Sequence, residues 1–395
     1  MSHWQELEGK YLMQTVKRTP ITLVRGEGVR VWDEDGRQYL DFVAGWGVDS
    51  LGHCHPAVVR AVTEQVRTLI QTSNQFYTIP QVQLAELLVQ NSCLDRVFFA
   101  NSGAEANEGA VKLARRYGKL YLNGAYEVIT TSNSFHGRTL AMVAATGQAK
   151  FQEPYTPVPA GFVNVKYNDI SAIRGATTSQ TCAVMLEPLQ GEGGVNLPDQ
   201  DYLAGARDWC DERGILLILD EIQTGMGRTG TLFAYEQYGV EPDIMTLAKG
   251  LASGLPIGAI LAKEKASVFR AGEHGSTYGG NPVTCAAGYA TLKFILENDV
   301  VKNAGRVGRQ LASGLEKLRQ EFTLVADVRG RGLLAAMEFR RDIAASVATA
   351  CLERGLLVNQ LKSNALRFMP PLIVSGEEVS EALDILGKAL LSVAK

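Results

Sequence analysis

The sequence predicts an α/β fold in two parts, a large domain on a mainly parallel sheet with helices on both faces and a smaller α+β domain. Between residues 50 and 290, short apolar runs of strand length alternate with segments of helical periodicity, as in βαβ units. Near Thr291 this alternation ends in one long helical pattern. We expect three segments: 1–46, an N-terminal segment packing with the small domain; 47–291, the large domain; and 292–395, the C-terminal small domain.

The N-terminal segment begins with a polar helical pattern and continues into a predicted β-hairpin. Val29 and Val31 alternate with polar residues, and the sequence Asp-Glu-Asp-Gly at 33–36 supplies the turn. A helix is then expected from Pro56, because proline is favoured in the first turn of a helix.

A candidate anion site follows the predicted strand Arg96–Ala100. Ser102 and Glu105 have the spacing of a capping box at the start of a helix, with Gly103 and Ala104 between them. Free backbone N–H groups and the helix dipole attract an anion to such a position. A plain N-cap explains Ser102 but not the two small residues beside it, so phosphate binding is favoured.

Two further predicted strands end in residues suited to a flat, charged ligand. After the strand Glu127–Thr131 come Phe135, whose ring can stack on a flat cofactor, and Arg138, which can bind a carboxylate through two hydrogen bonds. A solvated arginine is the alternative for Arg138. After the strand Ala183–Leu186, Glu192 lies in a glycine-rich loop.

The strongest chemical signal is a carboxylate and a lysine at the ends of two strands. The apolar run Ile215–Leu219 ends in Asp220, and the next such run ends at Lys249. Ligands of open α/β sheets bind at these carboxyl ends. A structural ion pair is one explanation. The other is a pyridoxal phosphate site, where the lysine forms a Schiff base with the aldehyde and the carboxylate keeps the pyridine nitrogen protonated.

The segment GMGRTG at 225–230 matches the G-x-G-x-x-G fingerprint of nicotinamide dehydrogenases. Its glycines come several residues after the strand instead of forming the turn, and no acidic residue ends a second strand ~20 residues on. An NAD-dependent dehydrogenase is therefore a remote alternative.

Composition argues against several other classes of protein. The 395 residues include 39 basic and 42 acidic side chains without a basic stripe, which argues against nucleic acid or an anionic membrane as main partner. No apolar run approaches the ~18–20 residues that span a bilayer, and no signal peptide is recognisable. Six scattered cysteines indicate reduced thiols in the cytoplasm, and no metal-ligand cluster is expected.

Several separated motifs resemble those of class III aminotransferases, pyridoxal phosphate enzymes of the aspartate aminotransferase fold (fold type I). The motifs are LILDEIQTGMGRTG, TLAKGLASGLPIGA, STYGGNP, NSGAEANE, FHGRT and LGHCHP. The likeness covers nearly the whole chain and is strongest to enzymes that act on N-acetylornithine. It implies ping-pong transfer of the terminal amino group of N-acetylornithine to 2-oxoglutarate, giving the semialdehyde and glutamate, in arginine biosynthesis.

The resemblance also implies roles for individual residues. Lys249 would form the Schiff base and later move a proton, and Asp220 would pair with the pyridine nitrogen. The other cofactor contacts would be Ser102, Gly103 and Ala104 at the phosphate, Phe135 on the ring, Gln223 at the phenolic oxygen, and Thr277 of the partner subunit in a homodimer. The substrate contacts would be Arg138 at the α-carboxylate, Glu192 and Arg367 as a switch for a second carboxylate, and Asn74 and Ser276 beside the pocket.

Trp46 is a departure, because the family members that act on N-acetylornithine usually have a small aliphatic residue at this position. A large ring near the pocket mouth could change which ω-amine fits, so ornithine, 4-aminobutyrate and lysine-pathway ω-amino acids stay open as donors. A racemase or aminomutase on the same fold would keep Lys249 and Asp220 but would not need the pair formed by Glu192 and Arg367.

Overall fold

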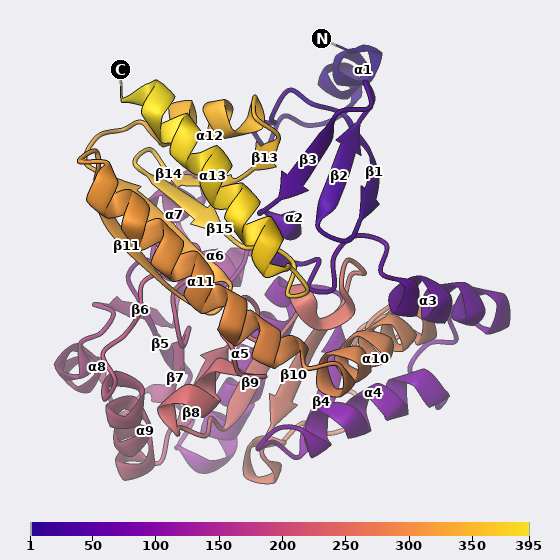
Figure 1. Ribbon diagram of the computed structural model, residues 1–395. Helices are drawn as coiled ribbons and strands as arrows, with labels where there is room; N and C mark the ends of the chain where they lie inside the picture. Colours follow the sequence, from indigo (N-terminus) through magenta and orange to yellow (C-terminus); the bar gives the residue numbers. More distant parts are fainter. Residues whose placement is uncertain (1, 395) are drawn as a thin grey trace.

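The computed structural model describes residues 2–394, which form a seven-stranded sheet and two four-stranded sheets (Figure 1). The strand order in the large sheet is β4-β10-β9-β8-β7-β5-β6. Strands β9, β8, β7, β5 and β6 run parallel, and β10 is antiparallel to both of its neighbours. The predicted α/β fold with a mainly parallel sheet is confirmed. The strands of this sheet are β4 (Arg96–Ala100), β5 (Glu127–Thr131), β6 (Phe162–Val165), β7 (Thr181–Leu186), β8 (Leu216–Asp220), β9 (Ile244–Leu247) and β10 (Gly258–Ala262).

Helices cover both faces of the large sheet, as strand β8 illustrates. Leu216 and Ile218 pack in one apolar cluster, whereas Leu217 and Leu219 pack in another, because successive side chains of a strand point to opposite faces. The first cluster includes α5 (Gly103–Tyr121) and α6 (Leu140–Ala145), and the second includes α9 (Tyr202–Arg213) and α10 (Pro282–Glu297). Burial on both faces explains why the central strands are apolar without alternation. The remaining helices of this region are α3 (Pro56–Thr68), α4 (Ile79–Gln90), α7 (Ala149–Gln152), α8 (Ile170–Ala176), and the 3-10 helices η1 (Glu153–Tyr155), η2 (Ala234–Tyr238), η3 (Lys249–Ala252) and η4 (Glu264–Ala266).

The N-terminal segment shares a sheet with the C-terminal part of the chain. After α1 (His3–Tyr11), strands β1 (Leu23–Glu27), β2 (Arg30–Asp33) and β3 (Gln38–Asp41) form an antiparallel sheet that includes the predicted hairpin, and α2 (Ala44–Gly47) follows. Strand β13 (Leu356–Leu357) pairs with β3 in parallel. The third sheet has the order β11-β12-β15-β14, formed by β11 (Val325–Arg331), β12 (Leu334–Phe339), β15 (Ala365–Phe368) and β14 (Asn359–Lys362).

The prediction of one long helix near Thr291 is wrong, because the chain forms two helices there. Helix α10 ends at Glu297 and α11 (Val300–Glu321) starts after Asp299, whose φ of 52° is left-handed. The amide of Asn298 donates to the Phe294 carbonyl and so satisfies an acceptor at the end of α10. The expected boundary at residues 291 and 292 falls inside α10.

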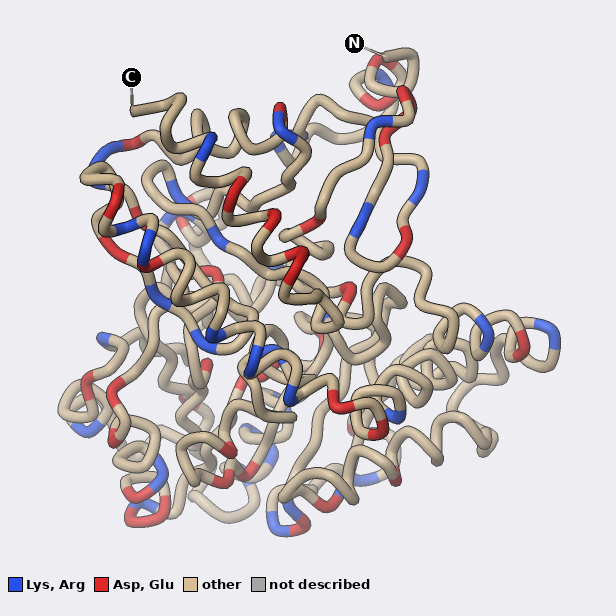
Figure 2. The backbone as a smooth tube through the Cα atoms, in the orientation of Figure 1, with Lys and Arg blue, Asp and Glu red and all other residues tan. Residues whose placement is uncertain are grey.

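The last two long helices lie side by side and carry opposite charges. Lys and Arg gather along α11, and Asp and Glu gather along α13 (Gly376–Val393) (Figure 2). The two helices lie on the outside of the β11-β12-β15-β14 sheet and of α12 (Ala344–Leu352). A capping box starts α13, with Ser375 and Glu378 bonded to each other's backbone. Within residues 2–394, no helix has the length and apolarity needed to cross a membrane.

Candidate active site

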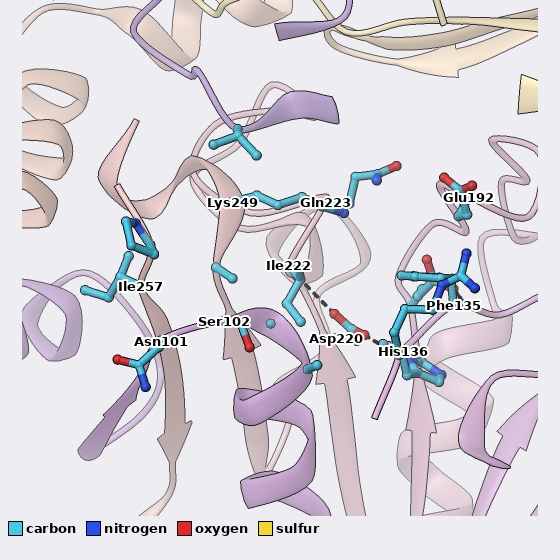
Figure 3. Close-up of a pocket in the computed structure, with 18 of the residues that line it drawn as sticks. Asn101, Ser102, Phe135, His136, Glu192, Asp220, Ile222, Gln223, Lys249 and Ile257 are labelled. Carbon is cyan, nitrogen blue, oxygen red and sulfur yellow. Dashed lines mark hydrogen bonds and ion pairs between the residues drawn. The ribbon is translucent and has the colours of Figure 1, made fainter. Parts of the chain in front are cut away.

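A cavity of about 400 Å³ opens at the carboxyl ends of β7, β8 and β9, between the large sheet and the loop after α2 (Figure 3). This volume lies within the usual range for small-molecule sites. Most of the expected cofactor and substrate contacts line it. They are Ser102, Gly103, Ala104, Phe135, Arg138, Glu192, Asp220, Gln223 and Lys249.

The start of α5 forms one end of the cavity. Ser102 is the N-cap, and its hydroxyl accepts from the Glu105 backbone N–H at 3.2 Å. The first-turn N–H groups, including those of Gly103 and Ala104, have no partner within a helix and can bind an anion. The predicted capping box is wrong, because the Glu105 carboxylate accepts from the N–H of Asn101, one residue before the cap.

Asp220, at the end of β8, is buried and surrounded by hydrogen-bond donors. Its Oδ2 accepts from Asn107 Nδ2 and from His136 Nδ1, each at 2.8 Å, and its Oδ1 accepts from the Ile222 backbone N–H at 3.1 Å. Thr246 holds the Asn107 amide through a further bond of 2.7 Å. These hydrogen bonds hold the carboxylate of Asp220 in one position beneath the cavity.

Lys249 lies two residues after the end of β9 and projects into the cavity (Figure 3). Burial lowers the pKa of Lys249, and the nearby Arg367 lowers it further. A lowered pKa makes the neutral amine, which is the nucleophilic form, more accessible. The φ of Lys249 is 37°, a left-handed conformation that costs a non-glycine residue about 1–3 kcal/mol.

Arg367, on β15, lies behind the cavity and is only 1% exposed. Its guanidinium forms an ion pair with Glu192 at 3.0 Å and donates to Gln223 Oε1 and to Asn359 Oδ1, each at 3.1 Å. Burial lowers the pKa of Arg367, whereas Glu192 raises it. Glu192 lines the cavity and Arg367 does not. The carboxylate of Glu192 therefore covers an arginine that could otherwise bind a ligand anion.

Glu187, to which the sequence assigned no role, ties two cavity loops together. Its Oε1 accepts from the Phe135 backbone N–H at 3.0 Å, and its Oε2 accepts from that of Gly191 at 3.2 Å. Burial raises the pKa of Glu187 to about 7. The loop that carries Phe135 and the loop that carries Glu192 are thus both fixed to the end of β7.

Besides Arg367, three expected site residues lie outside the cavity in the single chain. Asn74 donates to the backbone carbonyls of Ser276 and Gly279, at 3.0 and 2.9 Å, and Thr277 is exposed beside them. Asn101 lines the cavity, and its side-chain amide donates to the Ser276 hydroxyl at 3.1 Å. Ser276 is therefore linked to the cavity through Asn101.

Trp46 does not line the cavity, although Val48 does. The ring of Trp46 is 52% exposed, and its φ of 64° places it in a left-handed turn shared with Ala44 and Gly45. The turn brings residue 48, rather than residue 46, to the cavity wall of the single chain.

The G-x-G-x-x-G segment has a structural role here. Arg228 is buried, and its guanidinium donates to the backbone carbonyls of Leu333 and Pro370 in the small domain. The next element is the 3-10 helix η2, not an α-helix whose N-terminus could bind a pyrophosphate. The geometry does not support a dinucleotide site at this segment.

The residues of the cavity fit pyridoxal phosphate. The cofactor has a pyridine nitrogen, an aldehyde and a phosphate, and the cavity offers a buried carboxylate, an amine with a lowered pKa and a helix N-terminus for them. Asn107 and His136, which orient Asp220, were missed by the sequence reasoning. Both lie inside motifs quoted for other residues, NSGAEANE and FHGRT.

Comparisons with known proteins agree with this fit. The family model "Aminotransferase class-III" matches residues 11–390. Acetylornithine aminotransferases of Caldanaerobacter subterraneus and Methanocaldococcus jannaschii are 51% and 47% identical to the chain. The first match covers 98% of this chain and 98% of the relative, and the second covers 100% and 99%.

Solved structures show the same relationship. An ornithine aminotransferase of Toxoplasma gondii superimposes with a TM-score of 0.96 at 34% identity, covering 99% of this chain and 94% of the other. An acetylornithine aminotransferase of Elizabethkingia anophelis gives a TM-score of 0.89 at 34% identity, with 99% and 98% covered. The chain therefore belongs to the class III aminotransferases, pyridoxal phosphate-dependent transaminases of fold type I.

Proposed function

We propose that the enzyme transfers the terminal amino group of N-acetylornithine to 2-oxoglutarate in the cytoplasm, as a step of arginine biosynthesis. The observation that carries this proposal is the ion pair between Glu192 and Arg367 at the wall of a cavity that also holds Lys249. A transaminase with an ω-amine donor and a dicarboxylate acceptor needs an arginine that is covered for one substrate and free for the other. A racemase or aminomutase has no such need.

The cofactor contacts follow from the chemistry of each residue. Bound pyridoxal phosphate supplies an aldehyde and a ring that accepts electrons. The carboxylate of Asp220 would pair with the pyridine nitrogen, and Gln223 would face the phenolic oxygen. The ring of Phe135 would lie against the cofactor. Ser102, Gly103 and Ala104 would hold the phosphate at the start of α5.

Lys249 would act as the base and then as the acid of the reaction. Its Nζ, with a lowered pKa, takes the proton from the substrate carbon that bears the amino group and holds it for return. Such proton transfer typically contributes about 10²–10⁴-fold to the rate.

Two arginines would orient the substrates. Arg138 would bind the α-carboxylate of N-acetylornithine while Glu192 covers Arg367. When 2-oxoglutarate enters, Glu192 would turn away and Arg367 would bind its second carboxylate. The exposed fraction of the Glu192 side chain is 33%, so the carboxylate can reach water once it leaves Arg367.

We also propose that the active enzyme is a homodimer, in which Thr277 of the partner subunit completes the phosphate site. Large apolar side chains are exposed near residue 277 in the single chain, and Tyr77 is 99% exposed. A patch of this kind is typical of a subunit interface. The division into segments 1–46, 47–291 and 292–395 is part of the same proposal.

The donor specificity can be tested in half-reactions with purified, cofactor-loaded enzyme. We expect N-acetylornithine to convert to its semialdehyde, and 2-oxoglutarate added afterwards to yield glutamate, both measured by mass spectrometry. The kcat/KM for N-acetylornithine should exceed that for ornithine and 4-aminobutyrate by at least about tenfold, the effect of 1.4 kcal/mol of binding. A preference for another ω-amine would contradict the substrate assignment, keep the reaction class and direct attention to Trp46.

The switch can be tested by replacing Arg367 with methionine, which keeps an unbranched side chain. We expect the KM for 2-oxoglutarate to rise about 10- to 100-fold, because charged hydrogen bonds contribute about 1.5–3 kcal/mol, while the half-reaction of the ω-amine keeps its KM. Steady-state kinetics with each substrate varied give both values. Arg340→Met, on the surface of the same domain, is the control. Equal losses for both substrates would contradict the switch.

A further inference from the structure

Arg138 is held at the cavity by aromatic rings and not by a carboxylate of the described chain. Arg138 is exposed, and among residues 2–394 no carboxylate forms an ion pair with it. Its guanidinium lies instead against two aromatic rings, with its central carbon 3.9 Å from the centroid of Phe151 and 5.6 Å from that of Phe135. The closer ring belongs to a residue that does not line the cavity.

Phe151 is fixed independently of Arg138. It lies on the short helix α7, whose N-cap Gln148 and last residue Gln152 donate from their side-chain amides to neighbouring backbone. Gln148 donates to the Ser134 carbonyl at 3.0 Å, and Gln152 donates to the Thr146 carbonyl at 2.7 Å. These bonds attach α7 to the loop before Phe135 and to the residue after α6. The ring therefore offers Arg138 a surface of fixed position.

Stacking of this kind suits an arginine that must bind a carboxylate. The guanidinium is planar, and its N–H groups lie in its plane, so an aromatic ring can contact its face and leave the N–H groups free for two parallel hydrogen bonds. A free arginine side chain loses rotamer freedom when it binds, and prior stacking reduces that loss. An ion pair with a protein carboxylate would occupy the same N–H groups.

We propose that Phe151 is a positioning residue, which holds the Arg138 guanidinium in the orientation that receives the substrate carboxylate. The inference rests on the proposed role of Arg138. A competing role for Phe151 is support of the Phe135 ring, because the two rings meet edge to face at 5.8 Å and 78°. That role would act on the cofactor and not on the carboxylate.

A double-mutant cycle separates these roles. Phe151→Leu, Arg138→Leu and the double variant are prepared as loaded enzymes, and the Kd of glutarate, an unreactive dicarboxylate, is measured by calorimetry together with KM and kcat. We expect Phe151→Leu to raise the Kd and the carboxylate KM about three- to thirtyfold, the range of a cation–π contact, with kcat and cofactor affinity unchanged. In the Arg138→Leu background, Phe151→Leu should change the Kd no further.

Two variants control for folding. Phe151→Tyr keeps the aromatic ring and should have the wild-type Kd for glutarate. This variant also tests the role of the ring if Phe151→Leu does not fold. Phe162→Leu removes a ring that stacks on Arg115 at 5.3 Å outside the cavity, and it should leave the Kd unchanged.

Three results would overturn the inference. In the first, Phe151→Leu raises the Kd of glutarate as much in the Arg138→Leu background as in the wild-type enzyme. In the second, Phe151→Leu weakens cofactor binding and leaves the Kd of glutarate unchanged. In the third, Arg138→Leu itself leaves the Kd and KM unchanged, which would also remove the proposed carboxylate role of Arg138. If Arg138→Leu raises the Kd strongly but the two substitutions act independently, the proposed carboxylate role of Arg138 stands and only the role of Phe151 is lost.

Discussion

Replacement of Lys249 with alanine should abolish turnover, and we expect kcat to fall by at least about 10⁴-fold, the upper range for loss of a general acid–base group. Lys249 combines an amine with a lowered pKa, a position at the end of β9 and a left-handed backbone conformation. The cavity offers no second lysine among the residues that line it within the described chain. A methyl group can neither attack an aldehyde nor carry a proton.

The loss should be separable from loss of folding. Single-turnover assays compare Lys249→Ala with Lys263→Ala. Lys263 follows the last residue of β10, outside the cavity, and forms an ion pair with Glu241. Borohydride reduction of the loaded wild-type enzyme, followed by peptide mass spectrometry, should find the cofactor mass on the peptide that contains residue 249. Activity near wild type in Lys249→Ala, or the cofactor on another lysine, would rule out the assignment.

The features of the fold that could be predicted are those encoded locally. The run Ile215–Leu219 is apolar at every position because β8 is buried on both faces, and its end at Asp220 marks the edge where ligands bind. The same reasoning applies to β9 and Lys249. Their meeting at one cavity follows from parallel pairing of neighbouring strands.

The features that could not be predicted depend on contacts between distant segments. Asn107 and His136 hold Asp220 from α5 and from the loop after β5, and no spacing in the sequence connects the three. Phe151 reaches Arg138 from a separate four-residue helix. Such contacts depend on how distant segments pack together, and the local periodicity of the sequence does not predict them.

The ion pair of Glu192 and Arg367 shows what family resemblance adds. The two residues are far apart in sequence, and they come from a loop of the large domain and a strand of the small one. Composition and periodicity do not pair them, whereas the resemblance did. The structure adds the further contacts of Arg367 with Gln223 and Asn359, which hold its guanidinium beside the contact with Glu192.

Replacement of Asp220 with asparagine should lower kcat by about 10- to 1,000-fold, because an opposed carboxylate changes the pKa of a cation by about 1–3 units. The amide oxygen of asparagine can still accept from Asn107 and His136. Its NH₂ group would then face the Ile222 N–H, a donor, where the carboxylate of Asp220 now accepts at 3.1 Å. The variant thus loses the charge and one hydrogen bond.

A second buried aspartate distinguishes loss of charge from loss of structure. Asp243, at the other end of the sheet, is buried and paired with Arg207 and Lys265. Asp243→Asn should lower the melting temperature and leave the kcat of the folded enzyme unchanged, whereas Asp220→Asn should lower kcat well beyond any change in stability. Thermal denaturation and single-turnover rates of both loaded variants give the comparison. A kcat for Asp220→Asn within about threefold of wild type, a difference below 1 kcal/mol, would reduce Asp220 to a structural partner of His136. The burial of Asp220 among three donors would then serve the fold alone, and the charge beneath the cavity would have no part in the chemistry.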